Sequence, residues 1–459
     1  MTSPKPLDAT WVSPPTLSAQ FDIGRSIRSK VPRSTLSRRD TAGRDPLGIL
    51  DAQNATRVQD LLPMRAERMS ASPFAFYRGT AAIMAADLAR DPHSGIQVAS
   101  CGDAHVANFG FYASPQRTLV FDLNDFDEAG WAPWEWDLKR LVTSIVIAGQ
   151  STSRDERVVR NAALSAVRTY ARAMAAGVRL SPLERYYEHF DAHSRLSGTD
   201  PASRRTMRAA MRDAQKRTGE RATRRITERA ENGRLRFIES PPTMTHTAPE
   251  LEERLHAFTL DYVASTKVDI RMLFQHYVVS DVARRVVGVG SVGTRCFLVL
   301  MQDGSGHALL LQAKQAGRSV LEEFGGIVQP QAVRDHVEQF GEGGRVVAMQ
   351  RILQAVSDPF LGHLRVEENG NDFYVRQFHD MKGGIEMETL EDAPFRRYAD
   401  TCATTLARAH VQSSTAALIA GYIGNGRVVA ESILEWAYDY ADISRADYES
   451  YLEAQPGAR

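Results

Sequence analysis

The chain has 459 residues, which is too long for one hydrophobic core and predicts two or three domains. Its 56 basic residues balance 56 acidic ones, so no overall positive field favours nucleic acid or an anionic membrane as a partner. No apolar run approaches the roughly 20 residues that a membrane helix needs. The N-terminus also lacks the apolar segment of a secretory signal, and the three cysteines lack metal-ligand spacing. We therefore expect a cytoplasmic protein.

The first third of the chain predicts a lead-in followed by part of a helical lobe. Residues 1–45 are rich in Ser, Pro, Thr and Arg, which indicates a flexible or draped segment. In 46–150, apolar residues recur at helical spacing in two stretches, and two short apolar runs are typical of strands. We expect the helices at 73–89 and 134–146 and the strands at 96–98 and 118–122. Each strand leads into a polar turn, so this segment also supplies candidate site residues.

Residues 151–275 predict a helical connection or arm. Within it, 201–236 holds 12 Lys or Arg against four Asp or Glu, but no aromatic residue interleaves with these charges. A solvated helix face is therefore expected there, rather than a surface for nucleic acid. From Val286 onward the apolar period changes to two, which predicts an antiparallel β lobe over 276–392, followed by helices over 393–459. Strands are expected at 296–301, 308–314, 346–353 and 372–378.

The first polar turn reads Gly102-Asp103-Ala104-His105, and Asn108 follows five positions after the aspartate. Phosphoryl transfer rests on positioning and charge neutralisation, and needs a carboxylate that orients the acceptor hydroxyl and takes its proton. We expect Asp103 in that catalytic role, with the amide oxygen of Asn108 as a Mg²⁺ ligand. Metal-dependent phosphoesterases begin with a similar turn, but the further motifs of their two-metal site are absent from this sequence.

An acidic cluster follows the second predicted strand and consists of Asp122, Asp125, Asp127 and Glu128. Carboxylate oxygens are the ligands that hard cations such as Mg²⁺ prefer. Either Asp122 or Asp125 is the main metal ligand. Asp122 has the more usual distance from Asn108, whereas Asp125 heads an Asp-Phe-Asp run. A solvated acidic turn without metal is the alternative.

A glycine-rich segment, Gly288-Val289-Gly290-Ser291-Val292-Gly293, lies far downstream. A dinucleotide fold needs a helix directly after the third glycine, but strand-like residues follow here. The segment therefore predicts a turn between strands whose backbone N–H groups at Gly288, Gly290, Ser291 and Gly293 approach nucleotide phosphates.

Lys314 lies 26 residues after Gly288, on a later predicted strand. From there a lysine can reach the phosphates of a nucleotide, and a carboxylate on the next helix usually orients it. We expect Glu322 or Glu323 to do so. A surface lysine is the alternative for this residue alone.

The order of these two regions is inverted. In ordinary kinases the glycine turn precedes the catalytic turn, whereas here it comes second. The sequence thus predicts an α+β protein with a two-lobed protein-kinase-like fold, apparently circularly permuted. One lobe is expected to be largely helical, and the other to be an antiparallel sheet that binds nucleotide.

Several motifs resemble a bacterial family of uncharacterised proteins, domain-of-unknown-function family 2252, over most of the chain from about Asp45. They are Ser72–Gly79, Cys101–His105, Phe121–Glu128, Trp134–Leu141, Val287–Arg295, Ala355–Gly362 and Val375–Gln377. That family is grouped with protein-kinase-like folds. A looser similarity links the Asp103 region to aminoglycoside- and choline-kinase-like phosphotransferases. It implies that Asp103 is the base, that Asn108 with Asp125 or Asp122 binds Mg²⁺, and that Asp137 is a buried residue that braces the loop.

These observations lead us to expect a phosphotransferase that uses ATP and Mg²⁺. Its acceptor would be a hydroxyl of a small molecule or, as a second choice, of a protein. Two alternatives remain open at this point. One is a nucleotide-binding module without turnover, and the other is an enzyme that transfers the AMP part of ATP instead of phosphate.

Overall fold

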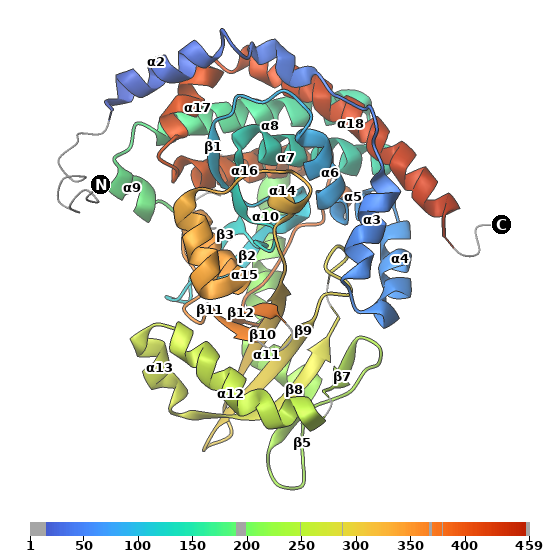
Figure 1. Ribbon diagram of the computed structural model, residues 1–459, viewed down its shortest axis with the longest axis vertical. Coiled ribbons are helices and arrows are strands. Elements are labelled where there is room, and N and C mark those ends of the chain that lie inside the picture. Colours follow the sequence, from blue (N-terminus) through green and yellow to red (C-terminus); the bar gives the residue numbers. More distant parts are fainter. Residues whose placement is uncertain are drawn as a thin grey trace, which may run out of the picture.

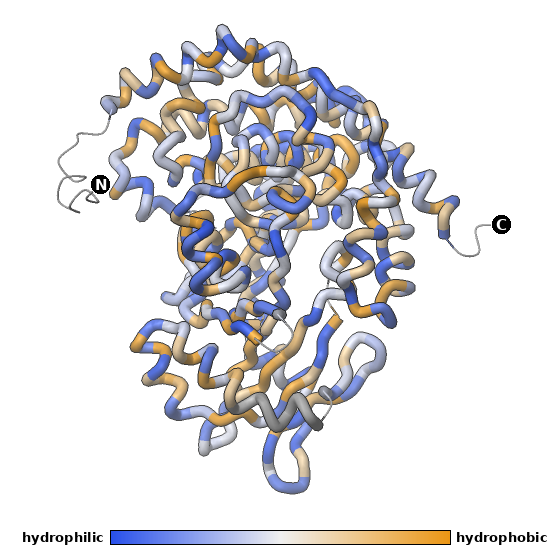
Figure 2. The backbone as a smooth tube through the Cα atoms, in the orientation of Figure 1, coloured by the Kyte–Doolittle hydropathy of each residue, from blue (hydrophilic) through white to orange (hydrophobic). Residues whose placement is uncertain are grey.

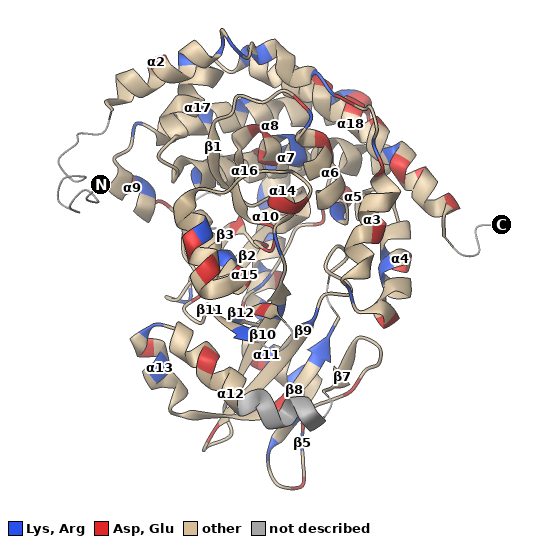
Figure 3. Ribbon diagram, in the orientation of Figure 1, with Lys and Arg blue, Asp and Glu red and all other residues tan. Residues whose placement is uncertain are grey.

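The computed structural model describes residues 15–189, 199–247, 249–286, 288–366, 370–378 and 380–455, and for 249–256 it describes the backbone alone. The chain forms an α+β structure with a large helical body and a smaller part built on a sheet (Figure 1). Acidic and basic residues are distributed over both parts (Figure 3). Among the described residues, no helix combines the length and the apolar character needed to cross a bilayer.

The helical body combines segments from both ends of the chain. Its helices are α2 (Leu17–Ile27), η1 (Arg33–Ser37), α3 (Pro46–Ala55), η2 (Gln59–Leu61), α4 (Leu62–Ser70), α5 (Pro73–Arg78), α6 (Ala81–Leu88), α7 (Trp134–Ser151), α8 (Glu156–Gly177), α9 (Pro182–Tyr187), α16 (Asp392–Val411), α17 (Ala416–Ile423) and α18 (Arg427–Glu453). The body also contains two small antiparallel sheets of two strands each. One pairs β1 (Gln97–Ser100) with β4 (Gly130–Pro133), and the other is the hairpin of β2 (Phe109–Ala113) and β3 (Leu119–Leu123), which lies between β1 and β4 in the chain.

Helix α7 forms the centre of this body, because every residue from Trp134 to Gly149 is buried. It contacts α8, α16 and α18, and the Trp134 ring stacks on Tyr170 with ring centroids 5.8 Å apart. Apolar stretches of the chain concentrate in this interior and along the strands of the sheet (Figure 2). A helix that is buried on all sides is rigid, so the turns that rest on α7 have a fixed support.

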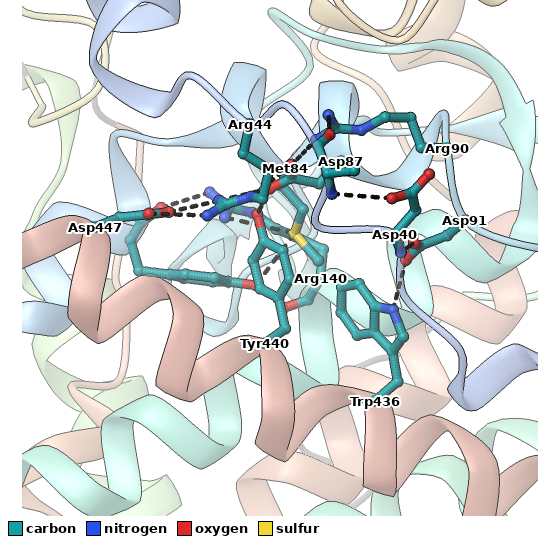
Figure 4. Close-up of polar contacts among 12 residues, drawn as sticks. Asp40, Arg44, Met84, Asp87, Arg90, Asp91, Arg140, Trp436, Tyr440 and Asp447 are labelled. Carbon is teal, nitrogen blue, oxygen red and sulfur yellow. Dashed lines mark hydrogen bonds and ion pairs between the residues drawn. The ribbon is translucent and has the colours of Figure 1, made fainter.

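Residues 15–45 of the expected lead-in drape over α17 and α18. A polar cluster fixes the end of this segment, as Figure 4 shows. Arg44 donates hydrogen bonds to both oxygens of Asp87 and both oxygens of Asp447, and Tyr440 also donates to Asp87. The expectation for residues 1–14 lies outside the described part of the chain.

The sheet has six antiparallel strands in the order β11-β12-β10-β9-β8-β7. They are β7 (Met244–His246), β8 (Tyr277–Arg285), β9 (Cys296–Asp303), β10 (Ala308–Ala316), β11 (Gly362–Val366) and β12 (Asn371–Gln377). Helices α12 (Pro249–Ser265), α13 (Val268–Phe274) and α15 (Gln331–Leu353) accompany this sheet, whereas α14 (Val320–Glu323) contacts α6 and β4 of the helical body. In the pair of β12 and β10, Lys314 of β10 is directly opposite Tyr374 of β12. Both side chains contact Asp127, which follows β3 of the helical body, so both are on the face of the sheet toward that body.

The structure differs from the sequence-based expectations in several elements. Gly79 ends α5, so 73–89 forms two helices; an added Cβ at Gly79 would lie 2.8 Å from the Met69 side chain. The strand expected at 346–353 is the end of α15, where Val346, Met349 and Leu353 are buried at helical spacing.

The segment expected to be a helical arm is also more complex. It contains α10 (Pro201–Lys216), α11 (Gly219–Ile226) and the hairpin β5 (Thr227–Arg229) with β6 (Leu235–Phe237). Strand β7 belongs to the main sheet, so the sheet begins well before residue 276. Helix α10 buries Met211 and Ala214 in the core and is therefore packed on the body, with its basic residues on the outer face.

Candidate active site

A polar cavity of about 380 Å³ lies where the helical body meets the sheet. Asp103, His105 and Asn108 from the first turn line it, together with the glycine-rich segment from Gly288 to Ser291. A second cavity of about 410 Å³ is also lined by Gly288 and Ser291, and it shares Asp125 with the first. Segments that are far apart in the sequence therefore converge on two adjoining cavities.

The first turn has a conformation that only glycine fits easily at position 102. Gly102 has φ +75°, and a Cβ there would lie 2.2 Å from the carbonyl oxygen of Glu128. Asp137 braces the turn, since its two oxygens accept hydrogen bonds from the backbone N–H groups of Cys101 and Gly102, at 2.8 and 3.1 Å. Asp137 is itself buried and contacts His410 Nε2 at 3.1 Å, as the resemblance implied for a loop-bracing residue. Burial acts to raise its pKa, but the contacts with His410, Ser100 and the Cys101 N–H together outweigh burial and hold the pKa below its usual value.

Asp103 presents one bound oxygen and one open oxygen. Arg140 Nε donates to Oδ1 at 2.8 Å, and its guanidinium stacks over the Tyr77 ring, 4.0 Å from the centroid. Oδ2 has His105 Nε2 at 3.7 Å and accepts no hydrogen bond from a described residue. Burial raises the pKa of Asp103 in spite of the nearby Arg140. A carboxylate with a raised pKa and an open oxygen is suited to accept a proton from a hydroxyl.

Asn108 and Asp125 both offer oxygens to the first cavity. Asn108 Nδ2 donates to the Asp103 carbonyl at 2.8 Å, which leaves its amide oxygen for a ligand. Asp125 Oδ1 is buried without a hydrogen-bond donor, and its nearest cation is Lys314 Nζ at 3.6 Å. Burial acts to raise the pKa of Asp125, but Lys314 and the neighbouring cations outweigh this effect and lower it, so the group stays ionised.

These oxygens fit a magnesium ion that completes its shell with phosphate and water. A buried carboxylate oxygen without a donor is stabilised by a cation. Among the described residues, no three His, Cys, Asp or Glu side chains form a cluster able to hold a metal. Mg²⁺ commonly uses one or two carboxylates together with substrate phosphates.

Asp122 was the other candidate ligand, and the structure places it elsewhere. Its side chain is 1% exposed and lines neither cavity. Its Oδ2 accepts from the backbone N–H of Ala355 at 2.8 Å and lies 3.4 Å from Arg408. Asp122 therefore joins β3 to the end of α15, whereas Asp125 lines both cavities.

Lys314 is buried on the cleft face of β10 and contacts the acidic cluster. Its Nζ lies 2.5 Å from Asp127 Oδ2, and the Tyr374 hydroxyl donates to the other oxygen of Asp127 at 2.5 Å. Burial acts to lower the pKa of Lys314, but Asp125 and Asp127 raise it well above its usual value, so the side chain is cationic.

The expectation that Glu322 orients Lys314 is not met. Glu322 forms an ion pair with Arg318 at 3.8 Å, while Glu323 lines the first cavity. The carboxylates that contact Lys314 are Asp127 and Asp125 of the acidic cluster.

The glycine-rich segment contacts the helical body as well as the cavities. Arg68 and Arg57 donate to the carbonyls of Gly288 and Val292, each at 2.6 Å. A Cβ at Gly290 would lie 3.0 Å from the Arg78 carbonyl, so the turn passes close to α5. Gly293 has φ +91° and accepts from the backbone N–H of Val58, but it lines neither cavity.

Sequence reasoning missed the contacts that several residues make in this site. Arg140 lies three positions after Asp137 on α7, so helical spacing could have placed both beside the first turn. Asp127 lies two positions after Asp125 and could have been paired with Lys314. The sequence carries no local signal for the position of Arg376 or Lys382, which line the second cavity.

Together, fold and site define an α+β protein with a polar cleft between a helical body and an antiparallel sheet. The chain belongs to the family described as uncharacterized protein conserved in bacteria (DUF2252), whose model matches residues 57–454. No curated protein and no solved structure gives a match.

Proposed function

We propose that this chain is a phosphotransferase that uses ATP and Mg²⁺ and acts on a hydroxyl group of a small molecule. A protein hydroxyl is the second choice of acceptor. One observation carries the proposal: Asp103 and Asn108 line the same cavity as the glycine turn, and Lys314 lies in the adjoining cavity. A catalytic carboxylate, a metal-binding amide, a glycine turn and a strand lysine are the parts that kinases use for phosphoryl transfer.

The order of elements in the sheet part supports a kinase-like lobe. The glycine turn joins β8 to β9, and Lys314 is on the next strand, β10. A long helix, α15, then precedes the strands β11 and β12. Protein kinases likewise place the glycine loop before the strand lysine and the helix after it. The helical body carries the Asp103 turn earlier in the chain, which is why we infer a circular permutation.

Each residue has a stated task in this proposal. Asp103 uses Oδ2 to orient the acceptor hydroxyl and take its proton, while Arg140 fixes the carboxylate through Oδ1. Asn108 and Asp125 would hold Mg²⁺, which supplies positive charge against the phosphates when bound. Lys314 and the backbone of the glycine turn would contact the phosphates. Lys314 is buried, and burial strengthens its electrostatic interactions.

The test compares wild type with Asp103→Asn and with Asp261→Asn, which changes an exposed aspartate. ATP consumption is measured over a broad panel of hydroxyl acceptors. Loss of a general base typically lowers the rate about 10²–10⁴-fold, so Asp103→Asn is expected to lose turnover while Asp261→Asn keeps it.

Binding is followed by thermal shift with Mg-ATP, which Asp103→Asn should retain. A ligand at 100 times its dissociation constant adds about 2.7 kcal/mol of stability. If wild type binds Mg-ATP but consumes none, the alternative of a nucleotide-binding module without turnover is favoured. Label from the α position of ATP on the acceptor would identify AMP transfer, and equal rates in wild type and Asp103→Asn would refute the role of Asp103.

A further inference from the structure

The second cavity is lined by more basic side chains than the proposed function assigns to a task. It lies beside the cleft face of β10 and β12 and extends to the loop 380–384. Besides Lys314, its wall contains Arg117, Arg376 and Lys382. Polar side chains such as Gln312, on the cleft face of β10, complete the wall.

The carboxylates that line this cavity are already engaged. Asp380 forms an ion pair with Arg117. Both oxygens of Asp358 accept hydrogen bonds from backbone N–H groups, at 2.6 and 2.8 Å. Asp125 is shared with the first cavity and has Lys314 as its nearest cation. These three acidic groups therefore leave two of the cations without a direct negative partner.

Those two cations are Arg376 and Lys382. Arg376 donates to Gln312 Oε1 at 3.1 Å and to the Asn124 carbonyl at 3.2 Å, both of which are neutral. Within the described part of the chain, neither cation forms an ion pair with a carboxylate, and Lys382 makes no hydrogen bond. Both side chains line this one cavity, and the charge of Arg376 is the first cause that lowers the pKa of Lys382 to about 7, so Lys382 is cationic below about that pH. Two basic groups on one cavity wall, neither of them paired with a carboxylate, are stabilised by an anion that binds between them.

The backbone around Lys382 is held in place on both sides. Met381 has φ 52°, in the left-handed region that a non-glycine residue rarely adopts. Its N–H donates to the Arg217 carbonyl at the end of α10, and Gly383 exchanges two backbone hydrogen bonds with Phe111 of β2. Such strain persists only where the surroundings enforce it, and it is frequent at ligand-binding positions. Lys382 is thus presented to the cavity by a fixed loop.

We propose that Arg376 and Lys382 form a binding site for an oxyanion, a phosphate or carboxylate group of a substrate. A guanidinium and an ammonium suit the oxygens of such a group, because hydrogen bonds between charged partners are the strong ones. The assignment of that group to a substrate rests on the proposed function, whereas binding of the anion does not. The group is either a phosphate of the nucleotide or an acidic group of the acceptor.

The experiment measures binding of pyrophosphate alone, without nucleotide or metal, by calorimetry. It compares wild type with Lys382→Ala and with Lys267→Ala, which removes an exposed lysine. We expect Lys382→Ala to weaken pyrophosphate about 10–100-fold, the usual worth of a charged hydrogen bond, and Lys267→Ala to leave it unchanged. Melting without ligand shows that each variant is folded.

A second series with Mg-ATP identifies the source of the oxyanion. Weaker Mg-ATP binding in Lys382→Ala assigns the site to a nucleotide phosphate, and unchanged Mg-ATP binding with weaker pyrophosphate assigns it to the acceptor. If wild type does not bind pyrophosphate, or Lys382→Ala binds it equally well, the oxyanion site is refuted even when ATP is consumed. If pyrophosphate binding depends on Lys382 but ATP neither binds nor reacts, the site stands and the phosphotransferase proposal fails.

Discussion

Glu128 makes the pH dependence of stability a direct test of the cleft geometry. Burial raises the pKa of Glu128 from 4.5 to about 7, against the opposing hydrogen bond that its Oε2 accepts from the Val320 N–H at 2.8 Å. The folded protein therefore keeps this proton up to about pH 7, whereas the unfolded chain releases it near 4.5. Between these values the folded state binds more protons, so its stability falls as pH rises and stays lower above pH 7.

Glu128→Gln removes the titration and keeps an oxygen that can accept from Val320. The interval from 4.5 to about 7 corresponds to about 3 kcal/mol. We expect the variant to be as stable as wild type near pH 4 and up to about 3 kcal/mol more stable near pH 8.

The assay is urea unfolding at pH values on both sides of this interval, with the exposed Glu435→Gln as the matched control. The measured quantity is the difference between wild type and variant, because other groups titrate equally in both. A difference that does not change with pH, or a variant that is less stable near pH 8, would refute the buried placement of this carboxyl.

Two further variants test contacts of the site by unfolding. Lys314→Met should cost about 3–5 kcal/mol at neutral pH, because it leaves Asp127 and Asp125 without their cation; a loss below about 1 kcal/mol, as expected for a surface pair, would contradict this. Gly102→Ala should lower the melting temperature markedly, since the added Cβ would lie 2.2 Å from a backbone oxygen, whereas Gly304→Ala meets nothing within 4 Å. Equal melting temperatures of the two glycine variants would show that the turn at Gly102 can shift to accept the added Cβ.

Local patterns predicted the elements whose signals lie within a few residues. The hairpin of β9 and β10 follows from alternating apolar residues around a tight turn, and α7 follows from its helical apolar period. The prediction of a strand at 346–353 was wrong, because a short apolar run fits a strand or a helix equally well. In the structure this run is the buried end of α15. Sequence alone could not weigh that burial.

The residues of the candidate site also fall into two groups, those that a local motif predicted and those that no local motif could predict. Asp103, Asn108, Gly288, Gly290 and Ser291 line the predicted cleft, and each was found from a local motif. Their chemical roles stay predictions. The partners across the cleft could not be found in this way, because they depend on how distant segments approach one another. Asp127 rather than Glu322 beside Lys314 is such a case.

The hydrogen bonds of Arg44 with Asp87 and Asp447 have a consequence for folding during synthesis of the chain. Asp447 is 403 positions further along the sequence than Arg44. At the usual rate of about 5–20 residues per second, a ribosome needs about 20–80 s to synthesise that distance. Throughout this time the emerged segment lacks α18, the surface that later covers it. We therefore expect the draped segment to dock only after α18 has left the ribosome.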